Sequence, residues 1–165
     1  MRLDTAAGIA AIALAATAFA DEDGWSVASV DGGSEIVLAL GSTDGILDES
    51  GRETVYPSLE LHCAPGGPDA IGIRIDWRRY ISSFNTEVGF KAGDGKRNWL
   101  KLGVDTSNRV TLAKAGADSG RLLDLFATGG PLSVEVTPYS EGPVTARFDL
   151  AGYADALDEL RAACR

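Results

Sequence analysis

The side chains of this 165-residue chain that are best suited to chemistry are one histidine, His62, and two cysteines, Cys63 and Cys164. A Ser-His-Asp or Cys-His catalytic group would have to use His62, because each of them needs an imidazole as general base. His62 and Cys63 are consecutive in a segment that alternates like a β-strand, so their side chains point to opposite faces. The sequence therefore predicts no catalytic residues, and no residues are spaced as zinc ligands.

Acidic residues gather in two places where carboxylates could bind calcium. The two groups are Asp21, Glu22 and Asp23, and Asp44, Asp48 and Glu49. Neither spacing fits an EF-hand loop, so we expect solvated charge and neither a metal site nor a cofactor. A cell-wall or carbohydrate hydrolase is the enzyme alternative, since it needs only a pair of carboxylates, but the 24 acidic residues single out no pair.

One glycine-rich segment has the composition of a phosphate-binding loop. Gly93-Asp94-Gly95-Lys96 lacks both the full spacing of such a loop and a helix after it. The segment therefore predicts a hairpin turn.

The first 20 residues have the features of a cleavable signal peptide. Arg2 is followed by an apolar run of small residues, and Ala18 and Ala20 stand where a signal peptidase reads. The apolar run is too short to span a bilayer as a helix. We expect cleavage after Ala20, a mature domain over residues 21–165 that does not insert into a membrane, and a periplasmic or secreted location.

In an exported chain, an even pair of cysteines predicts a disulfide. In the segment 58–63, SLELHC, the apolar residues alternate with polar ones, which turns Cys63 toward the core. Cys164 continues one helical stripe with Tyr153, Leu157 and Leu160. Both cysteines then face inward, and a Cys63–Cys164 bond would tie the last helix to the sheet.

The elements that position these residues are mainly short strands separated by turn-forming residues. The expected strands lie at 25–30, 35–40, 58–63, 71–77, 88–90, 99–104, 132–136 and 144–150. Residues 42–56 are polar and predict a loop. Asp118 or Ser119 could cap a short helix that buries Leu122, Leu123 and Phe126.

Two tryptophans lie on opposite faces of their predicted strands. Trp77 shares its face with the isoleucines of segment 71–77, which predicts a core residue. Trp99 points away from the face shared by Leu100 and Leu102. We expect a helix to cover Trp99; the alternative is an exposed aromatic that is available to a partner.

The charge of the chain restricts its partners. A net charge of −9 opposes binding to nucleic acid or to anionic lipids and favours a basic protein partner. A small acidic inhibitor or binding module for a basic cell-wall hydrolase is therefore one alternative. The sequence leaves the oligomeric state open.

Several segments resemble the VasI/TagO family of exported proteins associated with type VI secretion. An early Pro-x-Leu-x-x-x-Cys strand corresponds to Pro57, Leu59 and Cys63. The later matches are Thr137 to Tyr139, Phe148 to Leu150, Gly152 and Cys164, and residues 75–77 and 88–99 look like the middle strands. The resemblance implies an exported, non-enzymatic accessory protein and contributes no catalytic residues.

Together these features predict a single α+β domain, a mainly antiparallel and sandwich-like sheet with a short internal helix and a C-terminal helix. We expect it to act as an accessory or adaptor through protein contacts.

Overall fold

The computed structural model describes residues 24–30, 35–64 and 66–165, which form an α+β domain. The predicted signal peptide and the first acidic group lie outside the described residues. The strands are β1 (Ser26–Val30), β2 (Glu35–Gly41), β3 (Ile46–Leu47), β4 (Thr54–Val55), β5 (Ser58–Cys63), β6 (Ile71–Asp76), β7 (Thr86–Ala92), β8 (Asn98–Val104), β9 (Val110–Ala113), β10 (Pro131–Val136) and β11 (Val144–Asp149). The helices are α1 (Ala117–Phe126) and α2 (Tyr153–Ala163).

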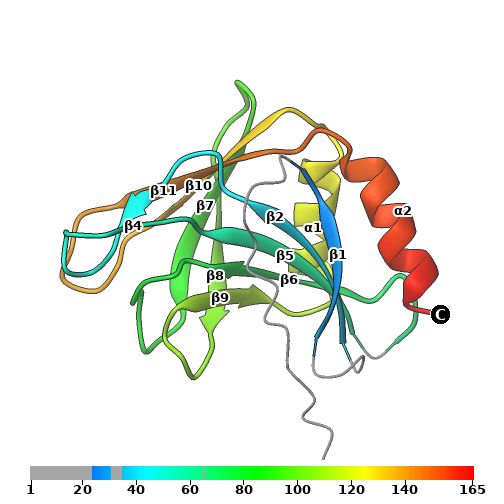
Figure 1. Cartoon of the computed structure of the whole chain (residues 1–165), viewed down its shortest axis with the longest axis horizontal. Coiled ribbons are helices and arrows are strands. Elements are labelled where there is room, and N and C mark those ends of the chain that lie inside the picture. The colour runs from blue at the N-terminus through cyan, green and yellow to red at the C-terminus, as the bar shows by residue number, and fades with distance from the viewer. Residues whose placement is uncertain (1–23, 31–34, 65) are drawn as a thin grey trace, which may run out of the picture.

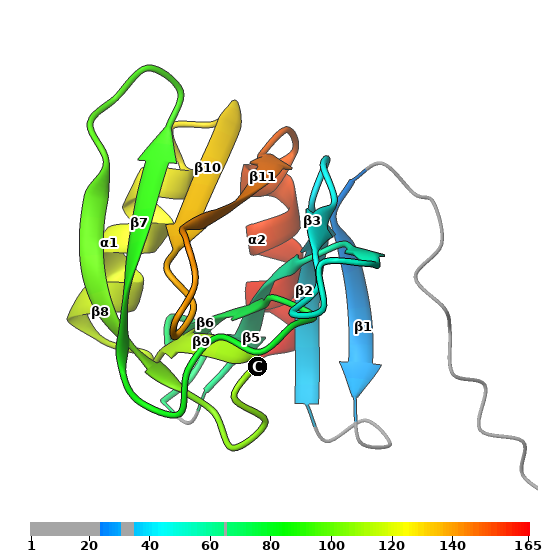
Figure 2. The same ribbon diagram turned by 90° about the vertical axis from the view of Figure 1, so that its left-hand side faces the viewer.

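Nine strands form one antiparallel sheet in the order β1-β2-β5-β6-β9-β8-β7-β10-β11, and β3 pairs with β4 separately. The sheet curls, so that its β1–β2 half and its β7–β10 half lie on opposite sides of α2 (Figure 2). Beyond β2, the Thr43 N–H donates to the Arg147 carbonyl in β11 at 2.8 Å. This contact brings the segment that follows β2 against β11, the strand at the far edge of the sheet.

Both helices pack on the inner side of the curved sheet (Figure 1). A row of aromatic rings joins them to it: Phe126 of α1 lies 6.5 Å from Phe90 of β7 and 6.0 Å from Tyr153 of α2. The Tyr153 ring also lies 5.7 Å from Trp25, and its hydroxyl donates to the Leu123 carbonyl at 3.2 Å. Burial raises the pKa of Tyr153 to about 12, so this donor keeps its proton.

The disulfide prediction is confirmed: Cys63 and Cys164 are bonded, with 5.7 Å between their Cα atoms. The α2 stripe is confirmed too, since Tyr153, Leu157 and Leu160 are buried. Trp77 is fully buried, and its indole N–H donates to the Thr111 hydroxyl at 3.0 Å. None of the described helices has the length and apolarity that crossing a membrane would require.

Two local predictions were wrong. The first residue before α1 is Gly116, and Ser119 lies in the first turn, where its hydroxyl accepts the Gly116 N–H at 3.0 Å. Gly116 has a φ of 151°, which a glycine adopts readily and which sequence periodicity does not reveal. The segment 42–56 is also more ordered than a loop, because it contains the β3–β4 hairpin.

Candidate binding surfaces

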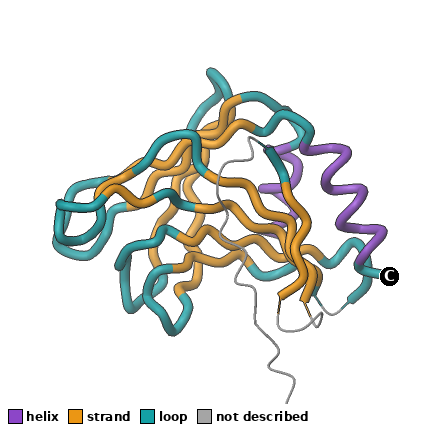
Figure 3. Tube along the Cα trace, in the orientation of Figure 1, coloured by secondary structure: helices purple, strands orange, loops and turns teal. Residues whose placement is uncertain are grey.

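Three connections meet at one end of the sheet, where loops gather in Figure 3. They are the β3–β4 hairpin, residues 77–85 between β6 and β7, and residues 137–143 between β10 and β11. The Tyr139 N–H donates to the Ile81 carbonyl at 2.8 Å, which joins the last two. Long-range contacts therefore hold together loops that are far apart in the sequence.

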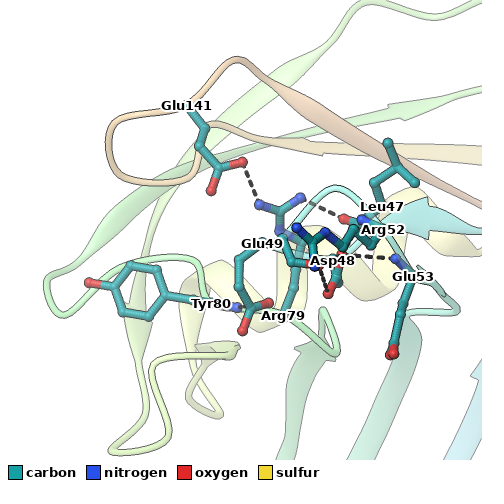
Figure 4. A network of polar contacts seen from close by, with 9 residues as sticks. Leu47, Asp48, Glu49, Arg52, Glu53, Arg79, Tyr80 and Glu141 are labelled. Atoms are coloured by element: carbon teal, nitrogen blue, oxygen red, sulfur yellow. Dashed lines mark hydrogen bonds and ion pairs between the residues drawn. The ribbon is translucent and has the colours of Figure 1, made fainter.

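Arg79 is the side chain that connects all three loops (Figure 4). Only 2% of it is exposed. Its Nη1 donates to the Leu47 carbonyl at 2.6 Å, and its Nη2 pairs with the Glu141 carboxylate at 2.5 Å. A buried guanidinium with these two partners fixes the position of the loops relative to one another.

The prediction from sequence missed Arg79, although a signal was present. The inward positions of β6 continue beyond the strand through Ile75, Trp77, Arg79 and Ile81, all of which are buried. A charged residue at a core position of such a pattern needs a partner. The pattern indicated a buried ion pair, but not where the partner lies.

The loop end also presents large apolar side chains to solvent. We call the exposed residues Leu47, Tyr56, Phe84 and Tyr139 the loop-end surface. Leu47 lies in the β3–β4 hairpin and Tyr139 in the connection 137–143. Phe84 lies in the connection 77–85, which also carries Arg79. The Tyr56 ring lies against Gly45, next to β3, because a Cβ on Gly45 would come within 3.3 Å of that ring.

The second acidic group does not converge on a metal. Asp44 pairs with Arg147 at 2.9 Å, and Glu49 lies 3.5 Å from Arg109. Asp48 accepts hydrogen bonds from the Ser50 hydroxyl and from the backbone N–H groups of Glu53 and Arg52, and these bonds lower its pKa to about 2. Among the described residues, no group of three potential ligands could hold a metal ion. These carboxylates form ion pairs and hydrogen bonds that stabilise the loops.

Trp99 lies on the outer face of β8, and 49% of it is exposed. The expectation that a helix covers it was wrong, because both helices pack on the inner face of the sheet. The tip of the indole lies over Gly89 of β7, where an added Cβ would come within 3.0 Å of the ring. The Arg97 guanidinium lies 5.9 Å from the ring centroid and pairs with Glu135 across β7 at 2.5 Å. Trp99 is thus an exposed aromatic in a fixed position.

His62 also faces outward, as the alternation predicted. Its ring occupies the space above Gly72 of β6, where a side chain would collide with it. The ion pair between Arg74 and Glu35, at 2.6 Å, spans the strand that carries His62. Burial, and then the charge of Arg74, lower the pKa of His62 below its usual value of 6.5. In the described structure the Nδ1 atom has no hydrogen-bond partner.

This environment predicts a pH dependence of stability. The pKa of His62 is lower in the folded state than in the unfolded state. The neutral imidazole therefore contributes to the free energy of unfolding fully above pH 6.5, and this contribution is lost as the pH falls through the folded-state pKa. We expect His62→Gln to lose less stability than the wild type between pH 7 and pH 5, measured by urea unfolding.

Glu60 provides the control of opposite sign. Burial raises its pKa above 4.5, so Glu60 destabilises the fold at neutral pH and this cost disappears on acidification. Glu60→Gln should therefore steepen the loss of stability on acidification. If the free energy of unfolding of His62→Gln changes with pH as that of the wild type does, the protonation of His62 does not contribute to the pH dependence of stability.

Two grooves in the described part of the chain are candidates for a ligand site. One, of about 350 Å³, lies between the end of α1 and the start of α2 and contains one carboxylate, Asp155. The other, of about 520 Å³, lies between the start of β8 and α1 and contains one carboxylate, Asp124. A glycosidase needs two carboxylates, so neither groove supports the hydrolase alternative.

No protein-family model and no curated protein sequence match the chain. Among solved structures, the fold is similar to the crystal structure of invasion-associated protein B from Bartonella henselae, with a TM-score of 0.53 and 14% sequence identity. The match covers 84% of this chain and 92% of that one. At this identity the similarity shows a shared fold and transfers no activity. The resemblance to VasI/TagO stays a prediction.

Proposed function

We propose that the chain is an exported accessory protein that acts by binding another protein through the loop-end surface, without catalysing a reaction. The observation that carries this proposal is the position of the exposed apolar residues. Of the six large apolar side chains exposed in the described structure, four belong to the loop-end surface. Single exposed apolar residues are ordinary, but a group of them at one end of a molecule is typical of an interaction site.

Two further features suggest which partners to examine first. The resemblance to VasI/TagO supports an accessory role and suggests components of a type VI secretion machine. The net charge of −9 favours a basic partner, and a basic cell-wall hydrolase that this protein would inhibit is the second candidate. A salt-sensitive loss of hydrolase activity in the presence of this protein would favour the second.

Site-specific photocrosslinking in the native cells tests the proposal. A photoreactive phenylalanine analogue is placed at Phe84 or Tyr139, and at Val27 as an exposed apolar control in the edge strand β1, outside the three loops. We expect one protein adduct shared by the first two positions and missing at Val27. Leu47→Asp should reduce this adduct several-fold while leaving the unfolding curve unchanged. No adduct, or the same adduct from all three positions, would contradict the proposal.

A further inference from the structure

The β7–β8 hairpin differs in charge from the rest of the protein. Residues 86–104 contain four basic and two acidic side chains, a net charge of +2, which leaves −11 for the remainder of a chain with a total of −9. The hairpin carries three of the four lysines of the chain, Lys91, Lys96 and Lys101. A local excess of positive charge on an acidic protein indicates an anionic ligand at this place.

The positive side chains surround the exposed tryptophan. Trp99 and Lys101 lie on the outer face of β8, about 7 Å apart along the strand, and Arg97 stands two residues before Trp99, directly ahead of the strand. Lys91 lies on the same face of β7. We call these four residues, with Gly89 beneath the indole, the Trp99 face; β7 and β8 lie in front of α1 in Figure 2.

The lysines of this hairpin are available to a ligand. In the described part of the chain, no ion pair involves Lys91, Lys96 or Lys101. Arg97, by contrast, is neutralised by Glu135 and lies against the indole. Arg97 and Gly89 therefore position the ring. The ammonium groups of Lys91 and Lys101 form no ion pair in the described structure, and Glu87 lies opposite Lys101 in the strand register.

A groove continues from this face. Only Gly103 and Val104 of β8 pair with β9, so the start of β8 has α1 beside it instead of a strand. The groove of about 520 Å³ between them contains Asn98 and Trp99 on one side, and Arg121 and the carboxylate of Asp124 on the other. Arg121 also lies 3.7 Å from Asp118, and 71% of its side chain is exposed. This volume lies within the range of small-ligand sites, and an amide and a guanidinium are suitable partners for hydroxyl and carboxylate oxygens.

We propose that the Trp99 face and the adjoining groove bind an acidic polysaccharide that carries carboxylate groups. The C–H groups of a sugar ring form an apolar face with partial positive charge, which fits the negative face of the indole. Lys91 and Lys101 pair with the carboxylates beside the stacked sugar. Arg121 meets the next part of the chain in the groove.

A protein partner fits this face less well than it fits the loop-end surface. The core of a protein interface is a group of apolar side chains. Around Trp99 the outward residues are charged, polar or glycine, namely Glu87, Gly89, Lys91, Arg97, Lys101, Ser133 and Glu135. One aromatic ring among charges matches a charged sugar chain instead.

Calorimetric titration of the full mature protein with oligogalacturonate tests the proposal. Methyl-esterified oligogalacturonate is the matched control, because it keeps the sugar backbone and masks the carboxylates. We expect saturable binding of the acid form and at least several-fold weaker binding of the ester. Trp99→Ala should weaken binding by about tenfold, the loss of one aromatic stacking contact, and Lys101→Gln should weaken it and reduce its salt dependence.

Two variants make the test specific to this surface. Lys114→Gln removes the one lysine outside the hairpin and should leave binding unchanged. Gly89→Val, which displaces the indole, should resemble Trp99→Ala. The proposal is overturned if the wild type does not bind, if the ester binds as well as the acid, if Trp99→Ala binds normally, or if a single-stranded oligonucleotide binds more tightly.

Discussion

Removing the disulfide with Cys63→Ala/Cys164→Ala is expected to lower the free energy of unfolding by about 3 to 5 kcal/mol. The bond joins residues 101 positions apart, and the chain-entropy model assigns about 4.7 kcal/mol to a closed loop of that size. Both sulfur atoms belong to side chains packed against the core, so alanine avoids burying a hydroxyl in their place. Guanidinium unfolding followed by circular dichroism measures the change.

Loss of the disulfide should destabilise α2 more than the rest of the fold. An isolated helix of 11 residues is only marginally stable in water, so α2 depends on packing and on the covalent link at its end. Amide exchange in α2 should accelerate more than in α1, a helix of 10 residues without a disulfide, which is the internal control. A change below about 1 kcal/mol, with the wild type verified as oxidised, would show that the bond does not stabilise this domain.

Sequence periodicity predicted those parts of the fold that depend on local burial. The alternation of Leu59, Leu61 and Cys63, and the helical stripe of Tyr153, Leu157 and Leu160, each follow from one face being buried. Since both patterns turn a cysteine inward, the sequence also predicted the disulfide correctly. The same reasoning placed Trp99 on the outer face of β8.

The remaining features depend on contacts that no local pattern encodes. Trp99 stays exposed because both helices pack on the inner face, and which face a helix covers is decided by the whole sheet. The partners of Arg79 are 32 and 62 residues away, in two different loops. Phe84 and Tyr139 lie in loops without periodicity, so their gathering at one end could be seen only in the folded structure.

Disrupting the Arg79–Glu141 pair is expected to have the second large effect on stability. Glu141→Ala leaves a charged guanidinium almost completely buried without its anion, and we expect a loss of about 2 to 3 kcal/mol. This is below the usual cost for a buried pair, because 37% of the Glu141 side chain is exposed and water can replace part of the carboxylate. Arg79→Met should cost a similar amount, since the Leu47 carbonyl also loses its donor.

A double-mutant cycle separates the pair from its surroundings. Arg79→Met/Glu141→Ala should destabilise by less than the sum of the single variants, with a coupling energy above about 1 kcal/mol. The Arg97–Glu135 pair is the matched control, because it has the same 2.5 Å separation but lies on the outer face, with 25% and 26% of its side chains exposed. Its coupling should stay below about 1 kcal/mol. Equal coupling in the two pairs would mean that burial does not strengthen the Arg79 contact.

The same variants connect stability to the proposed binding surface. Because Arg79 holds the loops that carry Leu47 and Glu141, its loss should accelerate exchange of the Tyr139 amide, which donates to Ile81 at the same end of the sheet. The photocrosslinked adduct at Tyr139 should weaken with it, whereas binding of oligogalacturonate at the Trp99 face, which Arg79 does not contact, should not change. If the adduct persists at full strength in folded Arg79→Met, the partner does not depend on the arrangement of these loops.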